Sequence, residues 1–338
     1  MSADIAGTGD PAPAAGRPGD DAVLPFAVEA LDSRGRLVHL GPALDTILSR
    51  HAYPEPVARL IGEAAALTAL LGTALKFDGR FIFQTQSDGP VHMLVVDFEA
   101  PDRLRACARF DEAAVHAAIA EGRATSADLL GAGHLAMTVD QGPDMSRYQG
   151  VVPLDGRSLE DAAHQYFAQS EQIPTRVRLA VAEVVSRDAG HAPRHAWRAG
   201  GLLVQFLPES SARLPVRDLD PGDAPEGSLP LPVDEDDAWT EAASLVGTVE
   251  DHELTDPAVS AEDLLYRLFH ERGVRVYDRQ PIIERCRCSR DKVADMLRSF
   301  SADDRKDMVD EGRINVTCEF CSTAYDFDPA EFEVGEEE

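Results

Sequence analysis

Four cysteines lie near the C-terminal end of this 338-residue chain in two closely spaced pairs. The pairs read Cys286-Arg-Cys288 and Cys318-Glu-Phe-Cys321. Zinc prefers a tetrahedral shell, and four thiolates complete that shell. Two short pairs on separate turns can converge on one ion with little strain. The sequence therefore predicts that these four cysteines bind one Zn²⁺.

The same residues could also perform redox chemistry. Arg285, Arg287 and Arg290 flank the first pair, and we expect their charge to favour thiolate over thiol. Thiolates are the species that peroxide and hypochlorous acid attack. Oxidation of one ligand would remove a thiolate and weaken zinc binding. It would also remove the metal's contribution to folding, which is about 10–16 kcal/mol in zinc-finger peptides. The residues thus permit a redox-driven unfolding switch.

The cysteines are also compatible with two further roles. The site could be a static zinc ribbon in a constitutive adaptor protein, although ribbons usually use two C-x-x-C pairs and one pair here is C-x-C. Alternatively, Cys318 and Cys321 could form the active site of a thiol-disulfide oxidoreductase. That activity is expected where a helix opens at the first cysteine, and here the flanking residues are typical of strands. The fifth cysteine, Cys107, stands alone and is interpreted as a packed or surface residue.

Composition argues against several classes of partner. The chain has 32 basic and 60 acidic residues, a formal net charge of −28. Such a chain repels phosphate backbones and anionic lipid surfaces, so neither nucleic acid nor a membrane is expected as partner. No P-loop, H-E-x-x-H or G-x-S-x-G motif occurs, so we expect neither ATP use nor an enzyme. The N-terminus lacks the basic start and apolar stretch of a signal peptide, which favours the cytoplasm.

The periodicity of the remaining sequence predicts an α+β fold with strands in runs and helices between them. Two short strands are expected around Ser33-Arg34-Gly35, and an apolar helix follows through Val57 to Leu71. The predicted strands are 80–86, 91–98, 104–110, 135–139, 148–154, 176–185 and 197–207. The predicted segments are a disordered tail (1–22), a core domain (23–207), an acidic linker with metastable helices (208–280) and a zinc-binding redox-switch domain (281–338).

The linker and the cysteine domain have their own signals. Residues 208–237 are rich in Pro, Gly, Ser and acidic residues, and two amphipathic helices follow, one over 238–249 and one capped by Ser260. These helices either fold conditionally or simply pack on the core. In the cysteine domain, Ser289 and Ser301 are expected to cap helices, and the second cysteine pair is expected at the tip of a hairpin.

The C-x-C and C-x-x-C pairs, at the end of an acidic chain, resemble the heat-shock protein 33 family of redox-regulated chaperones. Other segments are similar to that family as well. They are Ala199-Gly-Gly-Leu-Leu-Val-Gln205, Tyr148-Gln-Gly-Val-Val152, Ser170-Glu-Gln-Ile-Pro-Thr175, and 264–270 with 274–277. The resemblance covers about residues 23–332. The N-terminal tail lies outside it, and the stretch 209–237 is longer than the family's usual linker.

The resemblance implies an ATP-independent holdase that protects unfolding client proteins from aggregation. In its reduced state one zinc would be bound and the linker would cover the core. On oxidation, zinc would leave, Cys286 would pair with Cys288 and Cys318 with Cys321, and the linker would expose apolar surface. The activated form would be a homodimer. The sequence does not identify the surface that binds clients; the apolar faces of the two linker helices are candidates.

Overall fold

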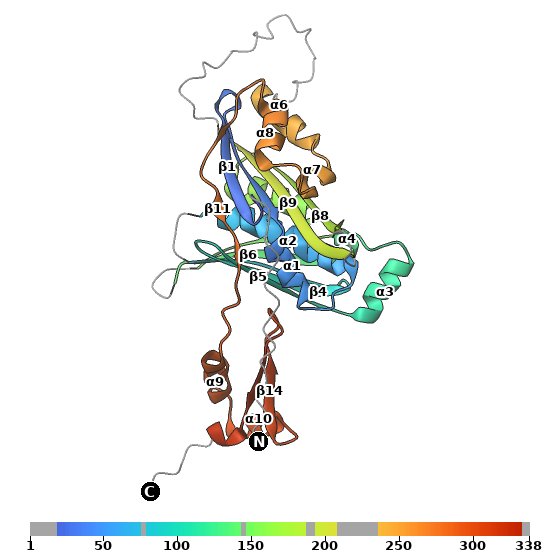
Figure 1. The fold of residues 1–338 in the computed structure, drawn as a ribbon, viewed down its shortest axis with the longest axis vertical. Helices are drawn as coiled ribbons and strands as arrows, with labels where there is room; N and C mark the ends of the chain where they lie inside the picture. Colours follow the sequence, from blue (N-terminus) through green and yellow to red (C-terminus); the bar gives the residue numbers. More distant parts are fainter. Residues whose placement is uncertain (1–18, 76–78, 143–146, 187–192, 208–235, 333–338) are drawn as a thin grey trace, which may run out of the picture.

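A computed structural model describes residues 19–75, 79–142, 147–186, 193–207 and 236–332. Figure 1 shows an elongated molecule with a central body of sheets and helices. The linker helices lie at one end of this body and the cysteine-containing module at the other. The predicted α+β class is confirmed. Within the described residues, no helix combines the length and apolar character needed to span a membrane.

The centre of the body is the predicted apolar helix, α2 (Glu55–Gly72), which follows α1 (Pro42–Ser49). Helix α2 contacts strands of both large sheets, so it is covered on opposite sides and is buried over most of its length. Its fully buried side chains include Leu60, Ile61 and Leu67. Burial of each such side chain stabilises the fold by about 1.5–3 kcal/mol. A helix that is apolar on most sides is therefore explained by its position between two sheets.

The first sheet has the strand order β10-β1-β2-β9-β8, with β11 also paired to β1. The turn between β1 and β2 lies earlier than predicted. A short 3₁₀ segment, η1 (Glu29–Leu31), and Asp32 with a φ of 44° make the turn, whereas Gly35 lies inside β2. A Cβ on Gly35 would lie 2.3 Å from the ring of Phe26, so this glycine serves close packing and not a turn. The strands are β1 (Ala22–Val28), β2 (Ser33–Leu40), β8 (Thr175–Ser186), β9 (Arg194–Phe206), β10 (Arg275–Val276) and β11 (Gln280–Pro281).

The second sheet has the order β12-β5-β4-β3-β6-β7. Its longer strands match the predicted ones closely, because alternating apolar residues mark them in the sequence. The two-residue strand β12 was not predicted, and it pairs in parallel with β5. The strands are β3 (Arg80–Ser87), β4 (Val91–Glu99), β5 (Arg103–Phe110), β6 (Gly133–Asp140), β7 (Tyr148–Pro153) and β12 (Ile283–Glu284), and the nearby helices are α3 (Glu112–Ala120), α4 (Ser126–Leu130) and α5 (Leu159–Tyr166), which continues as a short π-helical segment to Glu171.

The described part of the linker, from Asp236 on, carries three helices where two were predicted: α6 (Asp237–Gly247), α7 (Asp251–Thr255) and α8 (Ala261–Phe269). They pack against the first sheet and share a buried apolar cluster with it. The Pro- and Gly-rich linker stretch before Asp236 lies outside the described residues, as does most of the predicted N-terminal tail. The described chain begins before the predicted start of order, since Asp20 pairs with Arg198 of β9.

The C-terminal module contains α9 (Arg290–Arg298), α10 (Ala302–Asp307) and a three-stranded sheet of β13 (Val309–Asp310), β14 (Arg313–Thr317) and β15 (Ala324–Phe327), followed by η3 (Pro329–Phe332). Ser289 and Ser301 cap the two helices as predicted. The buried apolar cluster of the module consists of five side chains, those of Ala294, Leu297, Ile314, Phe327 and Phe332. A core of this size stabilises a fold only weakly. We therefore expect the module to have another source of folding free energy.

Glu63 of α2 provides a test of the central packing. Burial raises the pKa of this carboxyl to about 7. The hydrogen bond from Ser126 lowers the pKa, but by less than burial raises it. A folded-state pKa above the unfolded value of 4.5 means that the folded chain binds the extra proton between these pH values. The free energy of unfolding should therefore fall as pH rises from 4.5 to 7.

Replacement Glu63→Gln should raise the free energy of unfolding at pH 8 by about 1–3 kcal/mol. It should also flatten the pH dependence between 4.5 and 7, because Gln keeps an acceptor for Ser126 without the charge. Denaturant unfolding at several pH values measures both effects. The matched control is Glu55→Gln, in the exposed first turn of the same helix. Equal pH profiles for Glu63→Gln and the unmodified chain would contradict the interpretation.

Candidate metal centre

The two predicted cysteine pairs come together in space. The sulfur atoms of Cys286, Cys288, Cys318 and Cys321 all lie within 4.8 Å of one another. The Cys286 and Cys318 sulfurs are 3.7 Å apart, and those of Cys288 and Cys321 are 3.3 Å apart. Four sulfurs bound tetrahedrally at about 2.3 Å from one ion would be about 3.8 Å apart. The four side chains thus fit the ligand set of a single metal ion.

Two different local structures bring the pairs together. Cys286 and Cys288 lie between strand β12 and helix α9, outside any helix or strand. Cys318 and Cys321 lie in the turn that joins β14 to β15, as predicted. The backbone N–H of Cys318 donates to Thr323, and that of Ser322 donates to Cys318, at 2.9 and 2.8 Å. Because the second pair stands between strands and opens no helix, the context expected of a thioredoxin-like active site is missing.

Hydrogen-bond donors surround the sulfurs. The hydroxyl of Tyr325 donates to Cys288 Sγ at 3.1 Å, and the Thr323 hydroxyl lies 3.2 Å from Cys321 Sγ. Burial raises the pKa of Cys288 and of Cys318. For Cys321, burial also raises the pKa, but the hydrogen bonds of Thr323, Cys288 and Cys286 together outweigh burial, and the pKa is lowered. Donors of this kind stabilise thiolates and orient metal ligands.

Two of the three arginines that flank the first pair bind oxygen atoms, and within the described residues neither of them makes a hydrogen bond to a sulfur. Arg287 donates to Asp97 at 2.7 Å, and Arg290 donates to the carbonyl of Asp326 and to Glu331. Instead, the guanidinium that contacts a sulfur is Arg105 of strand β5, whose Nη1 lies 3.7 Å from Cys286 Sγ. Sequence reasoning missed this residue because 181 positions separate the two side chains and no local motif joins them.

The cysteine pairs also form the face with which the module contacts the core. Arg50 pairs with Glu284, and Arg109 Nε donates to Glu319 at 3.0 Å. His51 Nε2 lies 3.3 Å from the carbonyl of Phe320, and its Nδ1 lies 3.1 Å from the Ser322 hydroxyl. The contacts around the second pair involve Glu319, Phe320 and Ser322, so a rearrangement of this pair would disturb the contact with the core directly.

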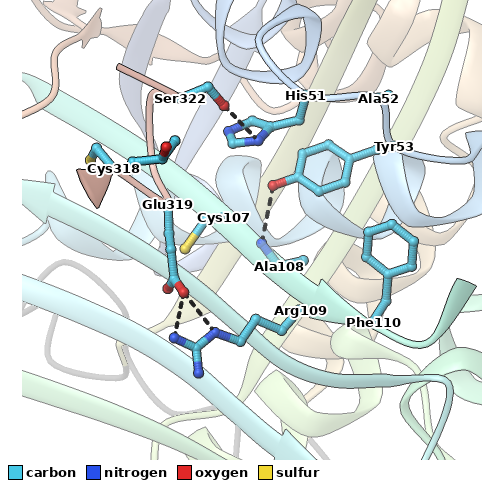
Figure 2. Close-up of a pocket in the computed structure, with 11 residues that line it drawn as sticks. His51, Ala52, Tyr53, Cys107, Ala108, Arg109, Phe110, Cys318, Glu319 and Ser322 are labelled. Carbon is cyan, nitrogen blue, oxygen red and sulfur yellow. Dashed lines mark hydrogen bonds and ion pairs between the residues drawn. The ribbon is translucent and has the colours of Figure 1, made fainter. Parts of the chain in front are cut away.

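A cavity of about 370 Å³ lies at this contact. Figure 2 shows His51, Tyr53 and Arg109 of the core on one side, and Cys318 and Glu319 of the module on the other. Cys107 of β5 lines the cavity but is buried, and burial raises its pKa to about 12. It therefore remains a thiol at neutral pH, in agreement with its interpretation as a packed residue.

Comparisons with known proteins agree on one family. The family model described as Hsp33 protein matches residues 21–328. A 33 kDa chaperonin of Caulobacter vibrioides is 49% identical and covers 92% of this chain and 95% of its own length. A 33 kDa chaperonin of Pseudomonas syringae is 37% identical and covers 92% of both chains.

A solved structure supports the fold independently. The crystal structure of a 33 kDa chaperonin, a heat shock protein 33 homologue from Thermotoga maritima, aligns with a TM-score of 0.68 at 20% identity. The alignment covers 92% of this chain and 96% of that one. From the family model and the curated relatives together, the chain belongs to the heat-shock protein 33 family.

Proposed function

We propose that this protein is a redox-regulated, ATP-independent chaperone that holds unfolding and oxidatively damaged proteins and prevents their aggregation. It is a binding protein of the cytoplasm and not an enzyme, and it uses no nucleic acid or membrane. The observation that carries this proposal is the convergence of four thiols in a module that has little apolar core of its own. Such a module depends on its ligands for folding, so chemistry at the thiols controls its structure.

In the reduced state, Cys286, Cys288, Cys318 and Cys321 would hold one Zn²⁺. The all-thiolate set matches the preference of zinc, and no ligand position is left open for substrate. Bound zinc would supply folding free energy to the module. Without it, five buried apolar side chains must offset the conformational entropy of about fifty residues.

Oxidation supplies the switch. Two thiolates, one hydrogen peroxide and two protons give one disulfide and two waters, so each cysteine pair consumes one peroxide. We propose the pairings Cys286–Cys288 and Cys318–Cys321. A disulfide offers no thiolate, and therefore the oxidised pairs no longer hold the ion and the module loses structure.

The linker is the element that would expose a client-binding surface. Its helices bury Trp239, Leu264 and Phe269 against the first sheet, where Phe26 and Val204 are also buried. The ring centroids of Phe26 and Phe269 are 5.8 Å apart. Release of these helices would expose apolar area on both the linker and the sheet, which is the kind of surface that binds unfolded chains or a second copy of this chain. The activated form is accordingly proposed to be a homodimer.

The metal site can be tested by stoichiometry. Purified, reduced protein should contain about one zinc per chain. Replacement Cys318→Ser should lower zinc affinity more than about a hundredfold, since loss of a group that only orients a ligand already costs about 10–100-fold. Hydrogen exchange should then increase in residues 286–332 while the two large sheets stay protected. The control is Cys107→Ser, which should keep full zinc content; loss of zinc in that variant, or retention in Cys318→Ser, would refute the ligand assignment.

The switch can be tested by following zinc, disulfides and chaperone activity together. Peroxide at raised temperature should release zinc as Cys286–Cys288 and Cys318–Cys321 disulfides form. Light scattering of a heat-unfolded client should then be suppressed without ATP. If zinc stays bound, or leaves without suppression of scattering, the protein is instead a constitutive adaptor with a structural zinc ribbon.

The role of the linker can be tested without touching a cysteine. A Cβ on Gly200 of β9 would lie 2.1 Å from the carbonyl oxygen of Leu254 in α7. Replacement Gly200→Ala should therefore displace the linker and give measurable suppression of client aggregation in the reduced state, with zinc still bound. Gly247→Ala is the control, because nothing lies within 4 Å of its added methyl group. A reduced Gly200→Ala variant that is as inactive as Gly247→Ala would show that linker displacement does not activate.

A further inference from the structure

One buried carboxylate of the core holds two arginines that lie beside the cysteines. Asp97 of β4 is 4% exposed. Its Oδ2 accepts from Nε and Nη2 of Arg105 at 3.0 and 2.6 Å, and from Nη2 of Arg287 at 2.7 Å. Glu99 lies 3.8 Å from Nε of Arg287 and is a second, longer partner. A carboxylate this buried is stable only with such partners, so the two guanidinium groups are fixed in place.

The groups of Arg105 that do not bind Asp97 contact the cysteine module. Its Nη1 lies 3.7 Å from Cys286 Sγ, and its guanidinium carbon lies 3.9 Å from the centre of the Phe320 ring. Its side chain is 13% exposed, so water screens these contacts weakly. The planar fork of arginine has five N–H donors and can serve a carboxylate, a sulfur and an aromatic face at once. A lysine could not make all three contacts.

The positions of the contacted residues link both cysteine pairs to this cluster. Arg287 is the middle residue of Cys286-Arg-Cys288, and Phe320 lies between Cys318 and Cys321. Arg287 is bound by Asp97, and Phe320 is stacked on Arg105. The core therefore holds each pair by a residue that lies between its two ligands. The surface pairs elsewhere on this contact, such as Arg109 with Glu319, touch no sulfur.

We propose that Arg105, oriented by Asp97, is a positioning residue of the metal site and couples the state of the Cys286 thiolate to docking of the module on the core. This inference rests on the proposed metal site. A thiolate at Cys286 accepts from Arg105 and balances part of its charge, whereas a sulfur without charge is a much weaker acceptor. Loss of the thiolate thus leaves a buried guanidinium one partner short, and docking weakens.

Strand β12 provides a readout of docking that does not depend on chaperone activity. Two backbone hydrogen bonds join this segment to β5. The N–H of Ile283 donates to the carbonyl of Asp102 at 2.7 Å, and the N–H of Arg285 donates to the carbonyl of Leu104 at 3.1 Å. Both donors lie within three residues of Cys286. Their hydrogen exchange therefore reports whether the segment that leads to the metal site remains paired with the core.

The experiment compares Arg105→Gln, Arg105→Lys and Arg109→Gln in the full chain loaded with Co²⁺. Arg109 is the matched control, since it lies on the same strand and pairs with the same module, but its side chain and that of Glu319 are more than half exposed. Such surface pairs contribute about 0–1 kcal/mol. The readouts are the thiolate-to-cobalt charge-transfer band, the rate of metal transfer to a chelator, and amide exchange at Ile283 and Arg285.

Arg105→Gln should shift the charge-transfer band, speed metal transfer by about 10–100-fold and increase exchange in β12. Arg105→Lys, which keeps the charge without the fork, should fall between Arg105→Gln and the unmodified chain. Arg109→Gln should change metal transfer by less than about threefold. If Arg105→Gln fails to fold, Arg105→Lys provides the same comparison with a smaller change.

The outcomes separate this inference from the proposed function. If the unmodified chain binds cobalt through its cysteines and is activated by peroxide, but Arg105→Gln and Arg105→Lys behave like Arg109→Gln, the coupling role of Arg105 is wrong and the switch stands. If the unmodified chain shows no thiolate-to-cobalt band, both the metal site and this inference are overturned.

Discussion

The structure depends on one constraint: the C-terminal module has too little apolar core to fold by burial alone. Five buried side chains support two short helices and a three-stranded sheet. In the main body, by contrast, α2 alone buries most of its side chains between two sheets. The free energy that the module lacks can come from four sulfurs gathered within 4.8 Å. Under the proposed function, a change at those sulfurs would change the fold of the module, while the body would keep its own core.

The module and the linker helices lie at opposite ends of the body, so a signal between them must cross it. The segment from Arg275 to Glu284 makes this connection. It pairs with β1 through β10 and β11, and with β5 through β12, and it leads directly into Cys286. These strands are only two residues long, and each contributes few hydrogen bonds. Under the proposed switch, the weak pairing of β12 with β5, next to Cys286, would be lost first, while β10 and β11 would keep the linker end on β1.

The sequence predicted the elements that carry their own periodic or capping signals. The apolar run of α2, the alternating strands of the second sheet and the Ser289 cap were all visible in the chain, because local physics determines each of them. The cysteine cluster was predicted for a similar reason, since the spacing within each pair is typical of metal ligands. The turn before β2 was misplaced, because Gly35 is required by the ring of Phe26 and not by its own backbone.

Contacts between residues that are far apart in the chain could not be predicted from the sequence. Nothing near Arg105 indicates that it reaches Cys286, and nothing near Asp97 indicates that it binds two arginines from different elements. The two-residue strands β10, β11 and β12 have no periodicity to detect, and their pairing is set by where the linker returns to the body. These residues become neighbours only when the chain folds, so no local pattern in the sequence marks them.

The linker is anchored to the body at both of its ends. Strand β9, which ends at Phe206, belongs to the sheet that the linker covers, and β10 pairs with β1 of the same sheet at Arg275. Linker helices released from the sheet would therefore remain a closed loop above it. A loop held in this way keeps its apolar faces at an effective concentration of about millimolar relative to their docking site. Under the proposed function, a client protein would compete with the linker helices for the sheet, and after the client leaves, the tethered helices could dock again without diffusing through solution.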